Sequence, residues 1–212
     1  RAKGGNVTEI YNPESDADKN DIRVSEVETH GDSIIASDIF QRVYLFLSNC
    51  EDPLESIPQA LGLACSEFDI SHSFIYRITD ENYSLELVSQ WFETENLRSY
   101  NEGKTHTIMD FLCCDKSDVK KLIDRKWLDA YVYAKDKPVM LDYYQKHGIL
   151  ASLLCPCTFK GKICAIIGFD EHTASRTWNE TELTQLSLVS DLIGKTVERE
   201  YLLRNKEELS HE

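Results

Sequence analysis

Two dense hydrophobic runs stand out in the C-terminal half of the chain, Ile149–Cys157 and Ile163–Phe169. They flank the polar break Lys160–Lys162, and apolar runs on both sides of a Gly-containing turn predict a β-hairpin. Because the runs are nearly continuous rather than alternating, we expect both faces of the hairpin to be covered, which places it in the middle of a sheet. Pro156 cannot donate a ladder hydrogen bond, so we expect a bulge or the end of strand pairing there.

A second hairpin is predicted by the runs Ser73–Thr79 and Leu85–Trp91, which a polar turn separates. In the second run Leu85, Leu87 and Trp91 occupy alternate positions. We therefore expect these three side chains on one face of the strand and a wetter face opposite.

The segment Ser33–Leu47 predicts a helix that is apolar around most of its circumference. Such a helix has to pack on two sides, and we expect its own sheet on one side and a partner chain on the other. Its two apolar stripes consist of Ile35, Ile39, Val43 and Phe46, and of Phe40, Tyr44 and Leu47.

Capping signals predict two further helices. One ends before Asp69 and begins either at Asp52, which precedes a proline, or at Ser56. The other begins at the capping box Asn179–Glu182 and continues to about Leu209. Its final turns are rich in charge and fit a narrow helix–helix seam.

Strands flanked by terminal helices predict an α+β fold, an antiparallel sheet with the N- and C-terminal helices packed on one face. The other face needs a roof of loops and helices, and the aromatic-rich segment Phe92–Lys137 is the candidate for it. A cavity between sheet and roof is the natural ligand site. Within and after this segment we expect a strand at Thr105–Asp110 and a helix capped by Ser117 at Ser117–Lys126. Trp127–Tyr133 could form either type of element. A short strand at Pro138–Leu141 and a helical turn at Asp142–His147 should follow.

The charge and the cysteines narrow the class of protein. A net charge of −14 argues against nucleic acid and anionic membranes as partners, because both repel such a surface. No apolar run approaches the roughly 18 residues of a membrane helix, and we see no signal peptide. The seven cysteines are irregularly spaced, so we expect reduced thiols in a cytoplasmic protein.

Several motifs resemble those of the GAF domain, a sensory α+β module. His147–Pro156 is similar to the family's GI-x-SLL-x-P strand, and Gly161–Asp170 is similar to its return strand, GK followed by GFD. An R-x-W-x-x-x-E pattern ending at Glu182 then leads into the last helix. The resemblance covers about Ser33–Leu209 and implies a GAF-like fold for it.

A shorter resemblance lies at the N-terminus. Arg1–Tyr11 resembles the closing helix and strand of the GGDEF domain, the diguanylate cyclase module, which implies a parent protein in cyclic di-GMP signalling. Asn12–Asp32 has the acidic composition of a linker. We therefore expect a GGDEF tail at 1–11, a linker at 12–32 and a GAF-like domain at 33–209, with a signalling helix at about 179–209.

Cysteine pairs suggest metal or redox chemistry, which we weigh against simple packing. Cys155 and Cys157 share one strand face and Cys113–Cys114 is a vicinal pair, but neither has zinc-like spacing. Free cysteines behave as small buried hydrophobes, and we expect that role here.

We interpret the other candidate residues as packed or solvated rather than functional. Cys114 precedes Asp115, whereas the bilin-binding members of the GAF family usually carry Cys-His at such a position, so the resemblance implies no chromophore. The histidines are scattered without metal or catalytic spacing. We expect Asp170 and Glu171 to be capping and solvated residues at a strand end, and we expect no catalytic residue, metal or cofactor.

These observations predict a non-enzymatic sensory and dimerisation module that binds a small ligand or relays a signal through its terminal helices to flanking domains. Two alternatives stay open, a thiol-dependent enzyme resembling free methionine sulfoxide reductase and a GAF domain without a ligand. The ligand-pocket candidates are Phe74, Tyr76, Trp91, Thr107, Trp127, Tyr131 and Cys155. The candidates for helix pairing in a homodimer are Ile35, Ile39, Val43, Phe46, Val197 and Tyr201.

Overall fold

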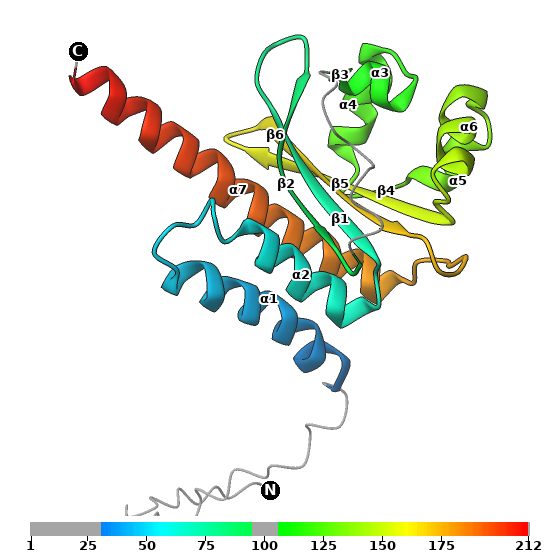
Figure 1. Cartoon of the computed structure of the whole chain (residues 1–212), viewed down its shortest axis with the longest axis horizontal. Helices are drawn as coiled ribbons and strands as arrows, with labels where there is room; N and C mark the ends of the chain where they lie inside the picture. Colours follow the sequence, from blue (N-terminus) through cyan, green and yellow to red (C-terminus); the bar gives the residue numbers. More distant parts are fainter. Residues whose placement is uncertain (1–30, 95–105, 212) are drawn as a thin grey trace, which may run out of the picture.

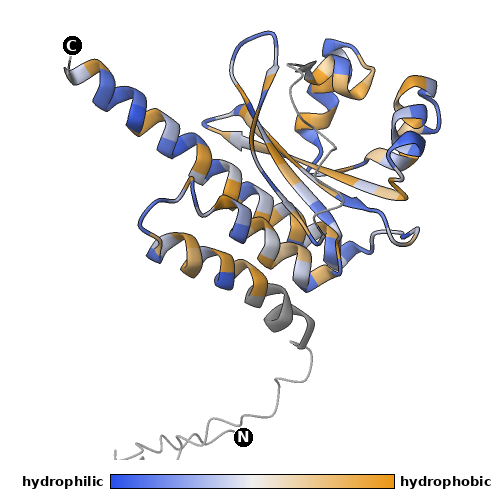
Figure 2. Ribbon diagram, in the orientation of Figure 1, coloured by the Kyte–Doolittle hydropathy of each residue, from blue (hydrophilic) through white to orange (hydrophobic). Residues whose placement is uncertain are grey.

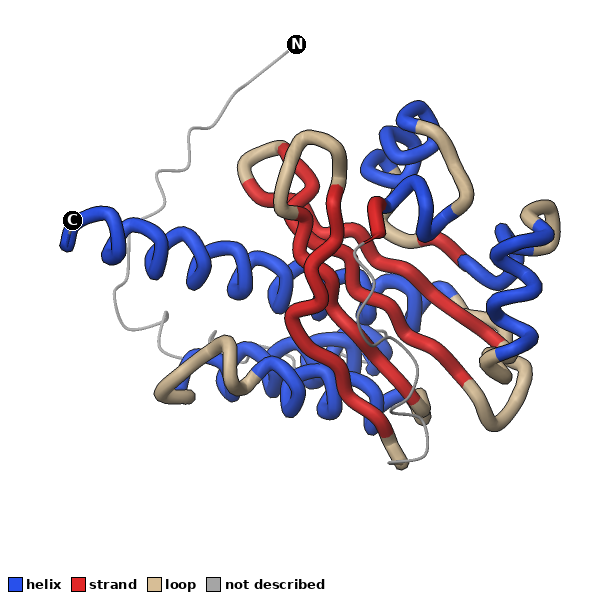
Figure 3. Tube along the Cα trace, turned by 45° about the horizontal axis from the view of Figure 1, so that its top comes forward, coloured by secondary structure: helices blue, strands red, loops and turns tan. Residues whose placement is uncertain are grey.

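A computed structural model describes residues 31–94 and 106–211 as three layers, with a six-stranded antiparallel sheet in the middle (Figure 1). Two helices pack on one side of the sheet, here called the helix face, and a third helix packs on these two. Four short helices form a roof on the other side, the roof face (Figures 1 and 3). The predicted α+β fold class is confirmed. The GGDEF-like tail and nearly all of the predicted linker lie outside the described residues.

The strands run in the order β3-β2-β1-β6-β5-β4 across the sheet. Their bounds are β1 His72–Ile78, β2 Ser84–Phe92, β3 His106–Thr107, β4 Leu128–Asp129, β5 Ala151–Phe159 and β6 Lys162–Glu171. The helix layer consists of α1 Gly31–Asn49, α2 Ile57–Phe68 and α7 Glu180–His211. The roof consists of α3 Ile108–Leu112, α4 Lys116–Asp124, α5 Ala130–Ala134 and α6 Pro138–Lys146.

The β5–β6 hairpin lies in the interior of the sheet, as its continuous hydrophobic runs predict. Its two-residue turn, Lys160-Gly161, has positive φ at both positions, which is the requirement of a type I′ turn. The expected irregularity near Pro156 is a register shift between Cys157 and Thr158.

Helices α2 and α7 pack tightly on the sheet, whereas α1 packs mainly on α2 and α7 rather than on the sheet as expected. Ile39, Val43 and Val197 are fully buried in one core together with the helix-facing strand residues. Gly194 of α7 brings that helix so close to β5 that an added Cβ would lie 2.5 Å from the Cβ of Cys157. Cys157 and its neighbour on the same face, Cys155, are therefore packing residues.

A bulge in β2 changes which side chains face the roof. Ile75 pairs with Ser89 and Tyr76 with Leu87, so Val88 is the extra residue. A bulge inverts the alternation beyond it, which leaves Leu87 packed in the roof-face cluster and moves Trp91 to the helix face. The expected common face of Leu85, Leu87 and Trp91 is therefore wrong.

Local capping selects one of the two predicted starts of α2 and differs from the prediction at α4. Helix α2 begins at Ile57, the later of the two predicted starts, because Pro53 to Ser56 form a turn whose backbone N–H groups are held by Asp52. Helix α4 is capped by Asp115, not by Ser117, since the Asp115 carboxylate accepts hydrogen bonds from the N–H groups of Ser117 and Asp118.

The roof is more helical than predicted. The segment Thr105–Asp110 yields only the short strand β3, because Thr107 forms a capping box with Asp110 and opens α3. Pro138–Leu141 is the first turn of α6, not a strand, with Pro138 at the favoured N-terminal position of a helix. Trp127–Tyr133 contains both types, β4 followed by α5.

Helix α7 begins at the predicted capping box and extends past the sheet toward the C-terminus (Figure 1). Figure 2 shows that its projecting end is mainly hydrophilic, whereas the strands carry long hydrophobic stretches. Within residues 31–94 and 106–211, none of the helices combines the length and the apolar character needed to cross a bilayer.

Candidate functional site

The roof face of the sheet carries a cavity between α3 and α6. The cavity holds about 210 Å³ and lies above Tyr76 of β1. We call it the roof pocket, and its lining residues are Tyr76, Asp110, Phe111, Cys113, Val139, Met140, Tyr143 and Tyr144. Aromatic walls with a few polar groups are the usual composition of a small-molecule site.

Aromatic stacking fixes the walls of the roof pocket. Phe74 meets Tyr76 edge-on at 5.4 Å between ring centroids, and Phe111 of α3 meets Phe74 edge-on at 6.1 Å. On the other side, Tyr131 of α5 stacks on Tyr144 of α6 at 5.8 Å. These contacts hold the α3 and α6 sides of the pocket in place through the sheet.

A buried polar network lies beside the roof pocket and is connected to it through Tyr144. The Tyr144 hydroxyl lies 3.3 Å from Ser152 Oγ, which donates to Asp170 Oδ1 at 2.6 Å. The other carboxylate oxygen of Asp170 lies 3.3 Å from His72 Nδ1. His72, Ser152 and Asp170 are each at most 2% exposed, so their polar groups are removed from water.

Asp170 and Glu171 are both buried, so the expectation that they are solvated strand-end residues is wrong. Burial alone would raise the pKa of Glu171, but hydrogen bonds from Thr173, Ser71 and the backbone of Ala174 outweigh it and lower the pKa. Glu171 thus ties the end of β6 to the next loop. Asp170 instead points to the roof face, where its partners come from β1 and β5.

The end of β6 also brings two histidines together. His72 and His172 have ring centroids 6.0 Å apart, and His72 stacks on Phe92 at 4.4 Å. Their scattered positions in the sequence conceal this arrangement, because the antiparallel pairing of β1 with β6 sets His72 opposite Asp170. No short-range motif could have revealed it.

The ionisation of the two pocket tyrosines follows from their surroundings. Burial, and then the charge of Asp170, raise the pKa of Tyr76 to about 12. The same two causes raise the pKa of Tyr144 well above its usual value. Both tyrosines therefore keep their protons at neutral pH. The Tyr144 hydroxyl donates to Ser152 and can still accept a hydrogen bond, and the Tyr76 hydroxyl can act in either role.

The structure brings together some of the predicted pocket residues and separates others. Phe74, Tyr76 and Tyr131 lie on the roof face or in the roof, and Tyr76 lines the roof pocket itself. Thr107 caps α3. Trp127 lies in a separate surface hollow that also contains residues of α7.

Trp91 and Cys155 lie on the opposite face of the sheet. Trp91 packs so closely on α2 that a Cβ added to Gly62 would lie 2.6 Å from its indole Nε1. Cys155 belongs to the helix-face core. Neither residue reaches the roof pocket because the sheet lies between them and the roof.

Sequence reasoning missed most of the pocket lining. Val139, Met140 and Tyr143 come from the first turns of α6, part of which was expected to be a strand. Met140 and Tyr144 stand four residues apart and are both buried, so a helical reading of Pro138–Lys146 would have placed them on one face.

The vicinal cysteines point to different places. Cys113 lines the roof pocket, whereas Cys114 lines a second hollow of about 290 Å³ beside Asp118 and Lys121. Burial and then the charge of Asp118 raise the pKa of Cys114 to about 11, so it is a weak nucleophile at neutral pH. The pair therefore does not form a joint thiol site.

The dimer-helix candidates are mostly core residues. Ile39, Val43 and Val197 are at most 1% exposed, and Phe46 and Tyr201 pack against the same core. The side chain of Ile35 lies outside the described residues. The exposed apolar residues of α1 belong instead to its other side, namely Phe40, Tyr44 and Leu45.

Comparison with known proteins identifies the fold. No family model matches the sequence, and no curated protein matches it. Among solved structures, the phycoerythrobilin-bound GAF domain of a cyanobacterial phytochrome is similar, with a TM-score of 0.63, 12% identity and coverage of 80% of this chain and 97% of that one.

Two further structures agree. The PixJ GAF domain of Thermosynechococcus elongatus has a TM-score of 0.54 at 14% identity, covering 74% of this chain and 92% of that one. The chromophore-binding domain of the Stigmatella aurantiaca bacteriophytochrome has a TM-score of 0.59 at 12% identity, covering 77% and 60%. The chain therefore has the GAF fold, while identities this low show the fold alone.

Proposed function

We propose that this chain is a non-enzymatic sensory domain that binds a small molecule in the roof pocket. The observation that carries the proposal is the combination of aromatic walls with the buried Tyr144–Ser152–Asp170 network at one side of the same cavity. A site of this composition takes up a flat ring between aromatic faces and orients it by hydrogen bonds to the hydroxyl of Tyr144.

The volume of the pocket limits the ligand. Sites for drug-sized molecules usually hold about 300–1,000 Å³, and the roof pocket holds about 210 Å³. We therefore propose a compact planar ligand with hydrogen-bonding groups. A bilin, the ligand named for the first of the similar structures, is larger, and Cys113 of the pocket is followed by another cysteine rather than by histidine.

We infer that β1 passes the occupancy of the pocket to α7. Neighbouring residues of a strand point to opposite faces, so Tyr76 faces the pocket while Arg77 faces α7. Arg77 Nε donates to Glu198 at 3.1 Å, and its guanidinium lies 4.4 Å from the Tyr201 ring centroid. A ligand that shifts β1 thereby changes how the projecting end of α7 is held.

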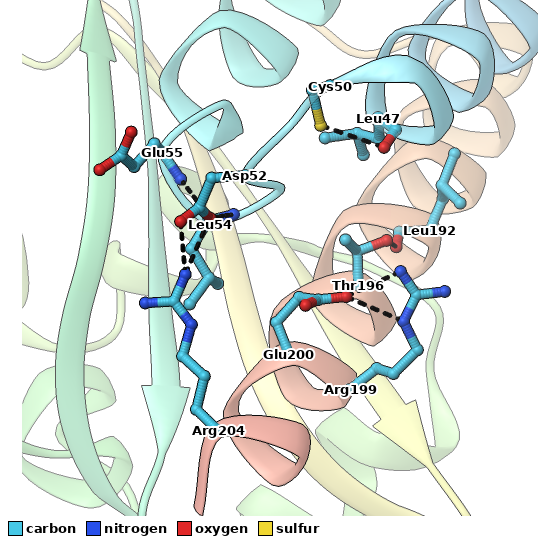
Figure 4. Close-up of polar contacts among 10 residues, drawn as sticks. All are labelled: Leu47, Cys50, Asp52, Leu54, Glu55, Leu192, Thr196, Arg199, Glu200 and Arg204. Atoms are coloured by element: carbon cyan, nitrogen blue, oxygen red, sulfur yellow. Dashed lines mark hydrogen bonds and ion pairs between the residues drawn. The ribbon is translucent and has the colours of Figure 1, made fainter. Parts of the chain in front are cut away.

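The loop between α1 and α2 makes a second connection to α7. Arg204 donates to both carboxylate oxygens of Asp52, at 2.8 and 2.6 Å, while Asp52 also accepts from the N–H groups of Leu54 and Glu55 (Figure 4). Both charged side chains are partly exposed, so this ion pair contributes little to stability. It is a contact between the α1–α2 loop and the projecting end of α7.

The wider setting is also part of the proposal. The resemblance of Arg1–Tyr11 to a GGDEF domain supports a cytoplasmic parent protein in cyclic di-GMP signalling. The exposed residues Phe40, Tyr44 and Leu45 support pairing of the chain with a second copy through α1. Ligand binding would then alter the arrangement of the two α7 helices and of the domains they join.

A thermal-shift screen of planar metabolites tests the pocket. We expect a subset of nucleobases or aromatic acids to raise the melting temperature, since a ligand that binds only the folded state stabilises it. Val139→Trp fills the mouth of the pocket and should abolish the shift. Val132→Trp, the same change at an exposed valine outside the pocket, should leave the shift intact.

Two other outcomes discriminate the alternatives. If no compound shifts the wild-type melting temperature, the ligand-free alternative is favoured and the proposal fails. If methionine sulfoxide is reduced and the turnover disappears in Cys113→Ser, the domain is a thiol enzyme rather than a sensor. Biliverdin, tested beside the metabolites, should give neither a shift nor a covalent adduct.

A further inference from the structure

His72, Asp170 and His172 meet at the end of β6 in a way that suits a metal ion. One ligand atom from each residue lies within 4.8 Å of the others. In a tetrahedral site with metal–ligand bonds of about 2.0–2.2 Å, ligand atoms stand about 3.3–3.6 Å apart, so the widest pair of the triad has to close by about 1.2–1.5 Å, which small side-chain rotations supply. The burial of His72 and Asp170 means that they need little ordering to bind.

We propose that these three residues form a binding site for a divalent first-row transition metal. Two imidazole nitrogens with one carboxylate oxygen is the ligand set of open non-haem Fe²⁺ sites and of catalytic-type Zn²⁺ sites. Mg²⁺ and Ca²⁺ prefer sites made of oxygen ligands only. The triad leaves at least one coordination position for water or for a small exogenous ligand.

The surroundings hold each ligand in place. Ser152 Oγ donates to Asp170 Oδ1, which leaves Oδ2 directed toward His72. The His72 ring is fixed by stacking on Phe92, with an angle of 8° between the planes. The ring of His172 packs against that of His72, with ring centroids 6.0 Å apart. Outer partners of this kind orient the ligands of established metal sites.

The proposed metal site is distinct from the roof pocket but linked to it. Asp170 is the point of contact, because its Ser152 partner also meets the Tyr144 hydroxyl. His172 is half-buried, whereas His72 and Asp170 lie deeper, so the ion enters from the His172 side. Metal binding at this site does not depend on whether an organic ligand binds in the roof pocket.

Equilibrium titration with Co²⁺ tests this site in tag-free chain, because the visible absorption of bound Co²⁺ reports its coordination. We expect one Co²⁺ per chain, displaced by Zn²⁺ and, under anaerobic conditions, by Fe²⁺, but not by Mg²⁺. Asp170→Asn and His172→Gln should each weaken binding by at least the roughly 10- to 100-fold that loss of an outer partner costs. His147→Gln, a histidine on the surface outside the triad, is the matched control and should bind like the wild type.

Circular dichroism checks that each variant is folded, and His172→Gln keeps the test decisive if Asp170→Asn unfolds. The proposal is overturned if the wild type binds no Co²⁺, or if His172→Gln binds it as tightly as His147→Gln. Val139→Trp, which fills the roof pocket, should retain the metal. Failure of the metal site and failure of the pocket are therefore separate results.

Discussion

At the scale of single residues, the contact between Phe74 and Gly168 controls the floor beneath the roof. A Cβ added to Gly168 would lie 2.0 Å from Phe74 Cζ, so the ring occupies the space that any side chain would need. Gly168→Ala forces Phe74 out of position, and we expect a loss of about 1–3 kcal/mol in the free energy of unfolding. Urea denaturation measures this loss.

Two further variants serve as controls for the Gly168→Ala experiment. Gly168→Ala combined with Phe74→Leu should recover part of the lost stability, because the smaller side chain vacates the space. Gly161→Ala meets no atom within 4 Å and should show only the cost of its positive φ, about 1 kcal/mol. Equal losses in Gly168→Ala with and without Phe74→Leu would contradict the steric explanation.

The cysteines give a prediction that depends on pH. Burial raises the pKa of Cys155 and of Cys164 to about 12, and raises that of Cys65 and Cys157 well above the usual value. A raised pKa means that these thiols stay protonated as the pH rises, and only the thiolate reacts. In the native chain, no more than three of the seven thiols should therefore react with a disulfide reagent, at pH 8 and at pH 10 alike.

Unfolding in urea should make the other four thiols reactive at the same time. The thiols that react early should be Cys50 and Cys113, which are only partly buried, and Cys114 should follow more slowly because burial raises its pKa to about 11. Mass mapping of the labelled peptides identifies them. Rapid native labelling of Cys155 would show that the helix face opens in solution and would contradict the packing role assigned to it.

Residue-level prediction from the sequence succeeded where a role depends on local chemistry. The expected packing role of Cys155 and Cys157 is confirmed, because apolar neighbours surround them in the sequence, whereas the expectation that Cys155 lines the pocket is wrong. Asp170 was placed in solvent because its partners, His72 and Ser152, come from other strands. Side-chain pairing across a sheet depends on register, which a single sequence does not provide.

At the scale of elements, Arg176 joins the start of α7 to the end of α2. Its guanidinium donates to Glu182 at 2.5 Å and to the carbonyl of Phe68 at 2.7 Å, and it lies 4.4 Å from the Trp178 ring centroid. Glu182 in turn accepts from the N–H of Asn179 at the cap of α7. One side chain thus stabilises a helix cap and an interhelical contact together.

Arg176→Ala should lower the free energy of unfolding by about 1–3 kcal/mol, because it leaves the partly buried Glu182 without its charged partner. Arg176→Lys keeps the charge but not the planar fork of donors, so it should fall between the alanine variant and the wild type. Chemical denaturation compares the three proteins. If Arg176→Lys is no more stable than Arg176→Ala, the charge alone contributes nothing and the loss of stability comes from the missing planar fork of donors.

Elements with strong local signals were predictable and the roof was not. The capping box of α7 and the turn of the β5–β6 hairpin follow from short sequence patterns. The short apolar run Pro138–Leu141 predicts a strand, but the tertiary packing of Met140 and Tyr144 selects the helix. The bulge at Val88 left no signal in the sequence.

At the scale of the whole molecule, the uncovered side of α1 leads us to expect a dimer. Phe40, Tyr44 and Leu45 are 36%, 51% and 49% exposed, although they lie on a helix whose other side is fully packed. Light scattering should give the mass of a dimer at micromolar concentration. Tyr44→Glu should weaken association about 30-fold or more, the effect of losing an interface residue worth about 2 kcal/mol.

Val132→Glu is the matched control for that experiment, since Val132 is 54% exposed but lies on the roof. It should leave the dimer intact. A wild-type chain that stays monomeric at high concentration would remove dimerisation from the proposal while leaving the roof pocket untouched.

The layered architecture was predictable from the whole pattern of strands and terminal helices, and the GAF-like motifs at Gly148–Asp170 agree with the fold that the structural comparison found. The site was only partly predictable. Its aromatic residues on β1 were expected, but the contributions of α3 and α6 depend on how the roof folds over the sheet. A cavity is a property of the assembled layers rather than of any one segment.

Mass spectrometry of the purified chain under native conditions tests the central claim, a ligand-binding roof pocket, most directly. We predict that the wild type and Val132→Trp carry the same small molecule, released on denaturation, and that Val139→Trp, which fills the pocket mouth, does not. Addition of the released compound should restore the bound mass in the first two proteins alone. A wild type without any bound species, or equal retention in Val139→Trp, would contradict the account.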